Sequence, residues 1–246
     1  MTIPTVQGQE AIDSLSGEMV FLSLLGNAFM AYPAKENRDW YGSLLDDELF
    51  SHIPFAERRP QVHEGLKSLR SWIGEYRSVP MDKTILDLQT DNTRLFHCAE
   101  NIMAPLWESV YRTRERLVLQ EHTLQVRRFY SRYGLALADG NREPDDHIGL
   151  ELLFVAFLSR KMLRTVAEDD HETYGVLRDA KRMFLADHLL QWSLLFCLQL
   201  EKHARTGFYR GMGLLLNGAS RELAAMYGID LSGLDSVCRD ERGMCT

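Results

Sequence analysis

The run from Ile148 to Leu163 would be apolar on nearly all sides of a helix, and this feature constrains the fold more than any other. Ile148, Leu152 and Val155 share one side of such a helix, and other apolar residues cover the remaining sides. A helix of this kind is stable only when other elements surround it. We therefore expect it at the centre of a hydrophobic core, for which 246 residues with 45% hydrophobic content are sufficient.

Further helices are predicted before and after this run, because apolar residues recur there at intervals of three and four. The patterns cover residues 9–32, 40–49, 62–76, 117–130, 172–186, 188–204 and 208–227, with a weaker one over 85–96. No stretch alternates apolar and polar residues over more than a few positions, and no Asn-Gly dipeptide joins two such stretches. The predicted fold class is all-α, in a single globular multi-helix domain.

The chain offers one candidate hinge and one candidate tail. Residues 136–146 are rich in turn-forming residues and are the best candidate for a hinge between two helical halves. Helical periodicity fails after Gly228, a predicted helix terminator. We therefore expect residues 1–228 to form the domain and residues 229–246 to form a loosely ordered tail.

Three glycines within residues 208–227 conflict with the helical pattern there. Gly211, Gly213 and Gly218 each cost up to ~1 kcal/mol relative to alanine inside a helix. Either another helix approaches closely at these positions, or the segment is broken.

The charge balance limits the partners of the chain. Lysine and arginine number 28 against 35 acidic residues, a net charge of -7. Such a chain repels a phosphate backbone unless a local basic face compensates. We expect no nucleic-acid partner, whereas a basic peptide would suit this charge.

Several other classes of function lack their usual signals. Cys98, Cys197, Cys238 and Cys245 form neither a CxxC pair nor a cluster with histidine, so we expect reduced thiols in a cytoplasm. No export signal is evident, and the longest apolar stretches fall short of the roughly 20 residues of a membrane span, so no stable membrane insertion is expected. Nucleotide-binding glycine motifs are absent and Ser109 lacks a G-x-S-x-G context, so we predict no cofactor and no catalytic residues.

Five polar residues gather at the start of the apolar run, and we call Glu143, Asp145, Asp146, His147 and Glu151 the acidic corner. His147 and Glu151 are four apart, so they could form an acid–base pair or half of a metal site, although a second ligand pair is missing. Alternatively, the acids occupy the first turn of the helix and complement its dipole by about 0.3 to 1 kcal/mol each. A third interpretation is that they bind the guanidinium of an arginine-bearing peptide, at about 1.5 to 3 kcal/mol per contact.

Two aromatic residues upstream also allow two interpretations. Trp107 and Tyr111 are four apart, a spacing typical of simple helix packing. If they lie at the rim of a groove, they could instead accept the apolar face of a peptide.

Several segments resemble one family, the TorD/DmsD family of redox-enzyme maturation chaperones, and its DmsD branch in particular. The segments that carry this resemblance are Pro105–Tyr111, Glu143–Ile148, His188–Trp192, Phe208–Arg210 and Thr93–Phe96. Their order and spacing both fit, and the resemblance covers roughly Leu88 to Leu214. Leu106 stands where the DmsD branch has a second proline.

The resemblance implies an all-helical cytoplasmic chaperone that binds the twin-arginine signal peptide of a molybdoenzyme. Such a chaperone holds the apo form of the catalytic subunit from export until its cofactor is inserted. Family positions in the binding region match Trp107, Asp146 and His147 here. We take the candidate peptide-binding residues to be Pro105, Trp107, Tyr111 and the whole acidic corner, in a monomer or a domain-swapped dimer.

The alternative hypothesis is a helical metal-dependent enzyme. It would use Asp146, His147 and Glu151 of the acidic corner as ligands or as acid and base. Stoichiometric metal in the purified protein would favour it.

Overall fold

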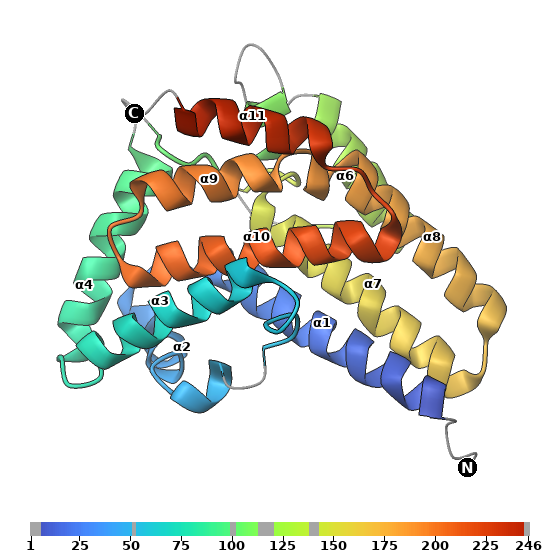
Figure 1. Cartoon of the computed structure of the whole chain (residues 1–246), viewed down its shortest axis with the longest axis horizontal. Coiled ribbons are helices and arrows are strands. Elements are labelled where there is room, and N and C mark those ends of the chain that lie inside the picture. The colour runs from blue at the N-terminus through green and yellow to red at the C-terminus, as the bar shows by residue number, and fades with distance from the viewer. Residues whose placement is uncertain (1–5, 51–52, 99–101, 113–120, 138–142, 244–246) are drawn as a thin grey trace.

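The computed structural model describes residues 6–50, 53–98, 102–112, 121–137 and 143–243, which hold helices and no strand (Figure 1). The all-α prediction is confirmed. The α-helices are α1 (Val6–Met30), α2 (Arg38–Ser43), α3 (Pro60–Tyr76), α4 (Met81–Asn92), α5 (Glu108–Arg112), α6 (Glu121–Arg132), α7 (Ile148–Glu168), α8 (His171–Asp187), α9 (Ser193–His203), α10 (Gly207–Tyr227) and α11 (Ser232–Gly243).

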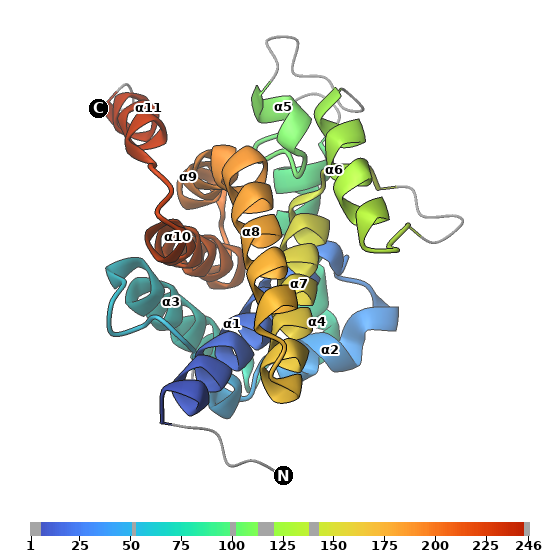
Figure 2. The same ribbon diagram turned by 90° about the vertical axis from the view of Figure 1, so that its right-hand side faces the viewer.

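Helix α7 lies at the centre of the core, as its sequence predicts, with Leu152, Val155 and Met162 fully buried. Helix α1 packs along it, and α8 packs beside it (Figures 1 and 2). At the crossing of α1 and α7, a Cβ added to Gly149 would stand 2.8 Å from the carbonyl oxygen of Gly26. The two backbones therefore touch where α7 begins.

Helix α10 is unbroken, and its three glycines lie where neighbouring helices approach closely. A Cβ on Gly218 would come 2.4 Å from Val62 Cγ2, and one on Gly211 would come 2.6 Å from Leu69 Cγ, both on α3. Gly213 faces α9 in the same way. Of the two alternatives drawn from the sequence, the close approach is confirmed.

A fully buried ion pair joins the three long helices of this core. The Lys181 ammonium on α8 contacts the Glu18 carboxylate on α1, and the Ser159 hydroxyl on α7 donates to the same carboxylate oxygen at 2.7 Å. Because unpaired buried charges cost several kcal/mol, the pair fixes how α1, α7 and α8 align.

The expected loosely ordered tail is wrong for most of its length, because residues 232–243 form α11. Helix α11 packs on α9, where Cys238 is buried against Leu194 and Leu198. Leu231, Leu234 and Cys238 lie three and four residues apart and pack in this cluster, so a helical period is present, but it spans only a short segment. Gly228 ends α10 with a φ of 61°, as predicted, whereas a domain boundary there stays a prediction.

Two predicted helices are divided. Residues 40–49 fall into α2 and a 3-10 turn at Asp47–Phe50, and residues 188–204 into a 3-10 turn at Leu189–Gln191 and α9. Residues 117–120 of another predicted helix, and residues 138–142 of the candidate hinge, lie outside the described residues.

Among the residues that the structure describes, one helical stretch, His171–His203, is long and apolar enough to cross a membrane by length and composition alone. However, 67% of its most apolar window is buried inside the structure. That burial is typical of a core helix, so the stretch is weak evidence for a membrane span.

We expect Gly26→Ala to destabilise the protein by about 1 to 3 kcal/mol, because the new Cβ would lie 3.0 Å from the Gly149 carbonyl oxygen in a packed core. Urea denaturation measures the change. Gly175→Ala on α8 is the matched control, since no atom lies within 4 Å of its added Cβ, and it should be neutral or stabilising. Equal loss of stability in both variants would contradict the close α1–α7 contact.

Candidate functional site

The segment that enters α7 docks against the segment that enters α5. The Ile148 N–H donates to the Leu106 carbonyl at 2.8 Å, and the Glu108 N–H donates to the Asp146 carbonyl at 3.0 Å. The two segments thus form an isolated antiparallel bridge. Two sequence motifs that are far apart in the chain lie side by side.

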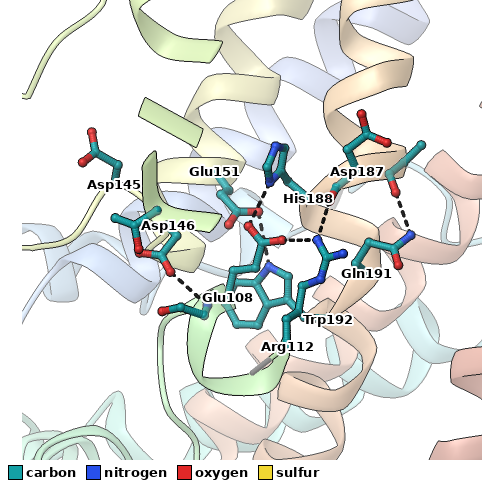
Figure 3. Close-up of polar contacts among 12 residues, drawn as sticks. Glu108, Arg112, Asp145, Asp146, Glu151, Asp187, His188, Gln191 and Trp192 are labelled. Carbon is teal, nitrogen blue, oxygen red and sulfur yellow. Dashed lines mark hydrogen bonds and ion pairs between the residues drawn. The ribbon is translucent and has the colours of Figure 1, made fainter. Parts of the chain in front are cut away.

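The Asp146 carboxylate holds this junction from inside. It is fully buried and accepts hydrogen bonds from the Ser109 N–H at 2.9 Å and from the Thr123 hydroxyl at 3.0 Å (Figure 3). Both of its oxygens are therefore used by the protein itself. Asp146 positions the starts of α5 and α6 relative to α7.

His147 caps α7 as a neutral ring. Its Nδ1 accepts the Gly149 N–H at 3.0 Å, so the ring proton lies on Nε2. Burial, with a smaller contribution from His97, lowers the pKa of His147 to about 3. The ring lies edge-on to Trp107, with centroids 6.4 Å apart. His147 is uncharged at neutral pH and cannot attract an anion or repel an arginine.

The corner acids do not together occupy the first turn of α7, as one interpretation expected. Only Glu151 lies there, and Asp145 and Asp146 precede the helix. Asp145 pairs instead with Arg127 of α6 at 2.7 Å, and its carbonyl accepts the Tyr130 hydroxyl at 3.0 Å. These acids therefore join α6 to the entry of α7 rather than complement the dipole of α7.

Sequence reasoning missed a further buried carboxylate, Glu108. One of its oxygens accepts from Arg112 at 2.6 Å, and the other lies 2.9 Å from Nδ1 of the buried His188 (Figure 3). Arg112 also donates to the Asp187 carbonyl at 2.6 Å. The spacing of Glu108 and Arg112, four residues apart, was the available signal.

Glu151 lies fully buried near the other two carboxylates. Burial first, and then Glu108 and Asp146, raise the pKa of Glu151 well above its usual range, so protonation is favoured. One carboxyl oxygen accepts the Trp192 indole N–H at 3.3 Å. Glu151 is a buried core group rather than a surface anion.

The remaining predicted residues keep some exposed surface. Pro105, Trp107, Tyr111 and Glu143 are half-buried. Within the described ranges, the Trp107 indole N–H is buried without a hydrogen-bond partner. The Tyr111 ring packs on Trp192, with centroids 5.2 Å apart. These four are the predicted site residues that keep accessible surface.

The metal-dependent alternative finds no support in the part of the chain that the structure describes. No group of three or more His, Cys, Asp or Glu side chains could hold a metal ion there. The Nδ1 atom of His147 and both oxygens of Asp146 already bind protein groups.

We expect Glu151→Gln to stabilise the protein increasingly as pH rises above about 4.5, the ordinary pKa of glutamate. A raised pKa means that the folded state binds more protons than the unfolded state, so wild-type stability falls as pH rises. Glutamine keeps an acceptor for Trp192 and removes that ionisation. Denaturation at pH 5 and pH 8 measures the difference.

Glu172→Gln is the control, because Glu172 is an exposed first-turn glutamate of the neighbouring helix α8. It should show a much smaller dependence on pH. If Glu151→Gln were less stable than wild type at pH 8 but not at pH 5, Glu151 would be needed as a carboxylate.

Residues 55–198 match the family described as nitrate reductase delta subunit. The chain is 32% identical over 124 residues to the Tat proofreading chaperone DmsD of Salmonella typhimurium, which covers 50% of this chain and 53% of that protein. It is 29% identical over 121 residues to the probable Tat proofreading chaperone DmsD of Haemophilus influenzae, covering 49% and 52%. It is 27% identical over 192 residues to the chaperone protein TorD of Aliivibrio fischeri, covering 72% and 86%.

The chain thus spans about half the length of the DmsD proteins it matches. These relatives are named as chaperones and not as enzymes. The family match includes the bridge between the α5 and α7 segments and covers more than half of the 246 residues. The chain therefore belongs to the nitrate reductase delta subunit family, which includes the TorD/DmsD chaperones that its motifs resemble.

Proposed function

We propose that this protein is a cytoplasmic chaperone, not an enzyme, that binds the twin-arginine signal peptide of a molybdoenzyme. It holds the apo catalytic subunit from export until the cofactor is inserted. The observation that carries the proposal is the docking of the α7 entry segment on the α5 entry segment, which joins the two motifs into one surface. The names of the DmsD relatives support this class of peptide.

The predicted peptide-binding residues divide into two groups by their exposure. Asp145, Asp146, His147 and Glu151 are at most 3% exposed, so a peptide in solution meets them only after the α7 entry segment separates from α5. They position the surface. The half-buried Pro105, Trp107, Tyr111 and Glu143 contact the peptide directly, with the aromatic rings taking its apolar side chains.

We expect micromolar affinity for a twin-arginine peptide, because binding must offset the ordering of a flexible chain. Trp107→Ala should weaken it by about tenfold or more, as expected when a large aromatic contact is removed. Isothermal titration calorimetry with the signal peptide of a molybdoenzyme encoded nearby measures both values.

Trp40→Ala is the matched control, since Trp40 is also half-buried but lies on α2. It should leave the affinity unchanged. Equal affinity of the Trp107→Ala variant and wild type would place the peptide elsewhere on the molecule.

A double-mutant cycle distinguishes positioning by Asp146 from direct contact. Asp146→Asn should cost about 1 to 3 kcal/mol of stability, because the new amide group faces donors rather than acceptors. Its effect on affinity and that of replacing both peptide arginines by glutamine should add within about 0.5 kcal/mol. Calorimetry on the four combinations gives the coupling.

A coupling well above that value would show that Asp146 grips an arginine directly and that the junction opens on binding. If neither Asp146→Asn nor the replacement of the peptide arginines changed the affinity, neither the acidic corner nor the arginines would take part in recognition.

A further inference from the structure

A second surface on the molecule has the features of a binding site. A cleft of about 590 Å³ lies between α6 and α8, beside α5. We call it the arginine cleft, and its main lining residues are Arg112, Gln125, Arg128, Phe129, Arg132 and Met183. It adjoins the buried Glu108 network through Arg112 but contains none of the predicted peptide-binding residues.

The cleft concentrates positive charge on an acidic protein. Arg128 and Arg132 lie one turn apart on α6, and both are exposed. The pair of Arg128 with Glu121 spans 3.3 Å between two mostly exposed side chains, so it contributes little stability. Arg132 lies over the Phe129 ring at 5.1 Å. Asp187 is the acidic side chain in the lining, so the two guanidiniums outweigh it.

Apolar side chains also line the cleft, beside the polar ones. Phe129 forms part of it, and Met183 on α8 is 46% exposed. An unbranched methionine side chain adapts its shape to varied apolar partners. The cleft therefore offers both positive charge and apolar surface, which suits a peptide that carries acidic and apolar side chains.

The helix ends argue against a compact phosphate as the ligand. Arg132 lies in the last turn of α6, and Asp187 ends α8, so both helices present their carboxyl ends to the cleft. The dipole at a helix carboxyl end disfavours a concentrated negative charge. Carboxylates spread along a chain fit better, because each can pair with one exposed guanidinium.

We propose that the arginine cleft binds an extended acidic segment of a partner protein, with carboxylates two residues apart and an apolar side chain beyond them. Residues four apart on a helix are separated by about 6 Å along its axis, close to the ~6.6 Å between alternate side chains of an extended chain. Arg128 and Arg132 thus match carboxylates on the same side of such a segment. This inference does not rest on the proposed function, because the acidic corner takes no part in it.

Fluorescence anisotropy tests this with a fluorescein-labelled peptide, Ser-Glu-Ser-Glu-Ser-Leu. The double variant Arg128→Gln/Arg132→Gln should bind it about tenfold more weakly, as expected for the loss of two exposed charge pairs. A peptide with glutamine in place of both glutamates should bind the wild-type protein as weakly as the acidic peptide binds the double variant. Titration with a twin-arginine peptide should be unchanged in the double variant, which separates this site from the corner.

Arg160→Gln/Arg164→Gln is the matched control, because these residues are also exposed, four apart on α7, and Arg160 also lies over a phenyl ring, that of Phe157 at 5.5 Å. It removes the same charge and should leave binding of the acidic peptide unchanged. An equal loss in the control, equal binding of the glutamine peptide, or no binding of the acidic peptide would overturn the proposal. So would pyrophosphate binding through Arg128 and Arg132 in place of the peptide.

Discussion

The buried carboxylate of Asp146 is the interaction on which the candidate site depends. It accepts hydrogen bonds from Ser109 and Thr123, and its own carbonyl accepts from Glu108, so one residue fixes the starts of three helices. A buried carboxylate that lost these donors would be costly, because the interior solvates charge poorly. The donors and the acid therefore keep one another in place. The position of Trp107 at the protein surface therefore depends on these internal hydrogen bonds.

Three carboxylates share that interior, and the protein stabilises them in different ways. Glu108 lies between the Arg112 guanidinium and the His188 ring, and Asp146 has two hydrogen-bond donors. Glu151 has the Trp192 indole on one oxygen, and its other oxygen has no hydrogen-bond partner among the described residues. The pKa of Glu151 is raised first by its burial and then by the nearby Glu108 and Asp146. Several acidic residues thus serve as internal polar links, and their number in the sequence overstates the negative charge at the surface of this region.

The sequence predicted features whose cause is local. All-round apolarity placed α7 in the core, and the glycines of α10 indicated either a close helix contact or a break, of which the structure shows the contact. It could not predict the antiparallel bridge, because backbone pairing between distant segments leaves no local pattern. The burial of Asp146 was missed for the same reason: its donors lie on α6 and at the start of α5. Helix α11 was missed because its contact with α9 rests on few apolar side chains, Cys238 among them.

Because most acids of the corner are buried, their charges contribute little to the short-range affinity for a twin-arginine peptide in the proposed complex. Since the most buried corner acids already have partners inside the protein, an incoming arginine gains little from them at short range. The net charge of -7 still attracts a basic peptide from a distance and accelerates encounter, within a Debye length of about 8 Å at physiological salt. Short-range affinity then comes from Trp107 and Tyr111. In the proposed complex, salt should therefore slow association more than it speeds dissociation, because screening acts on the encounter and leaves apolar contacts intact.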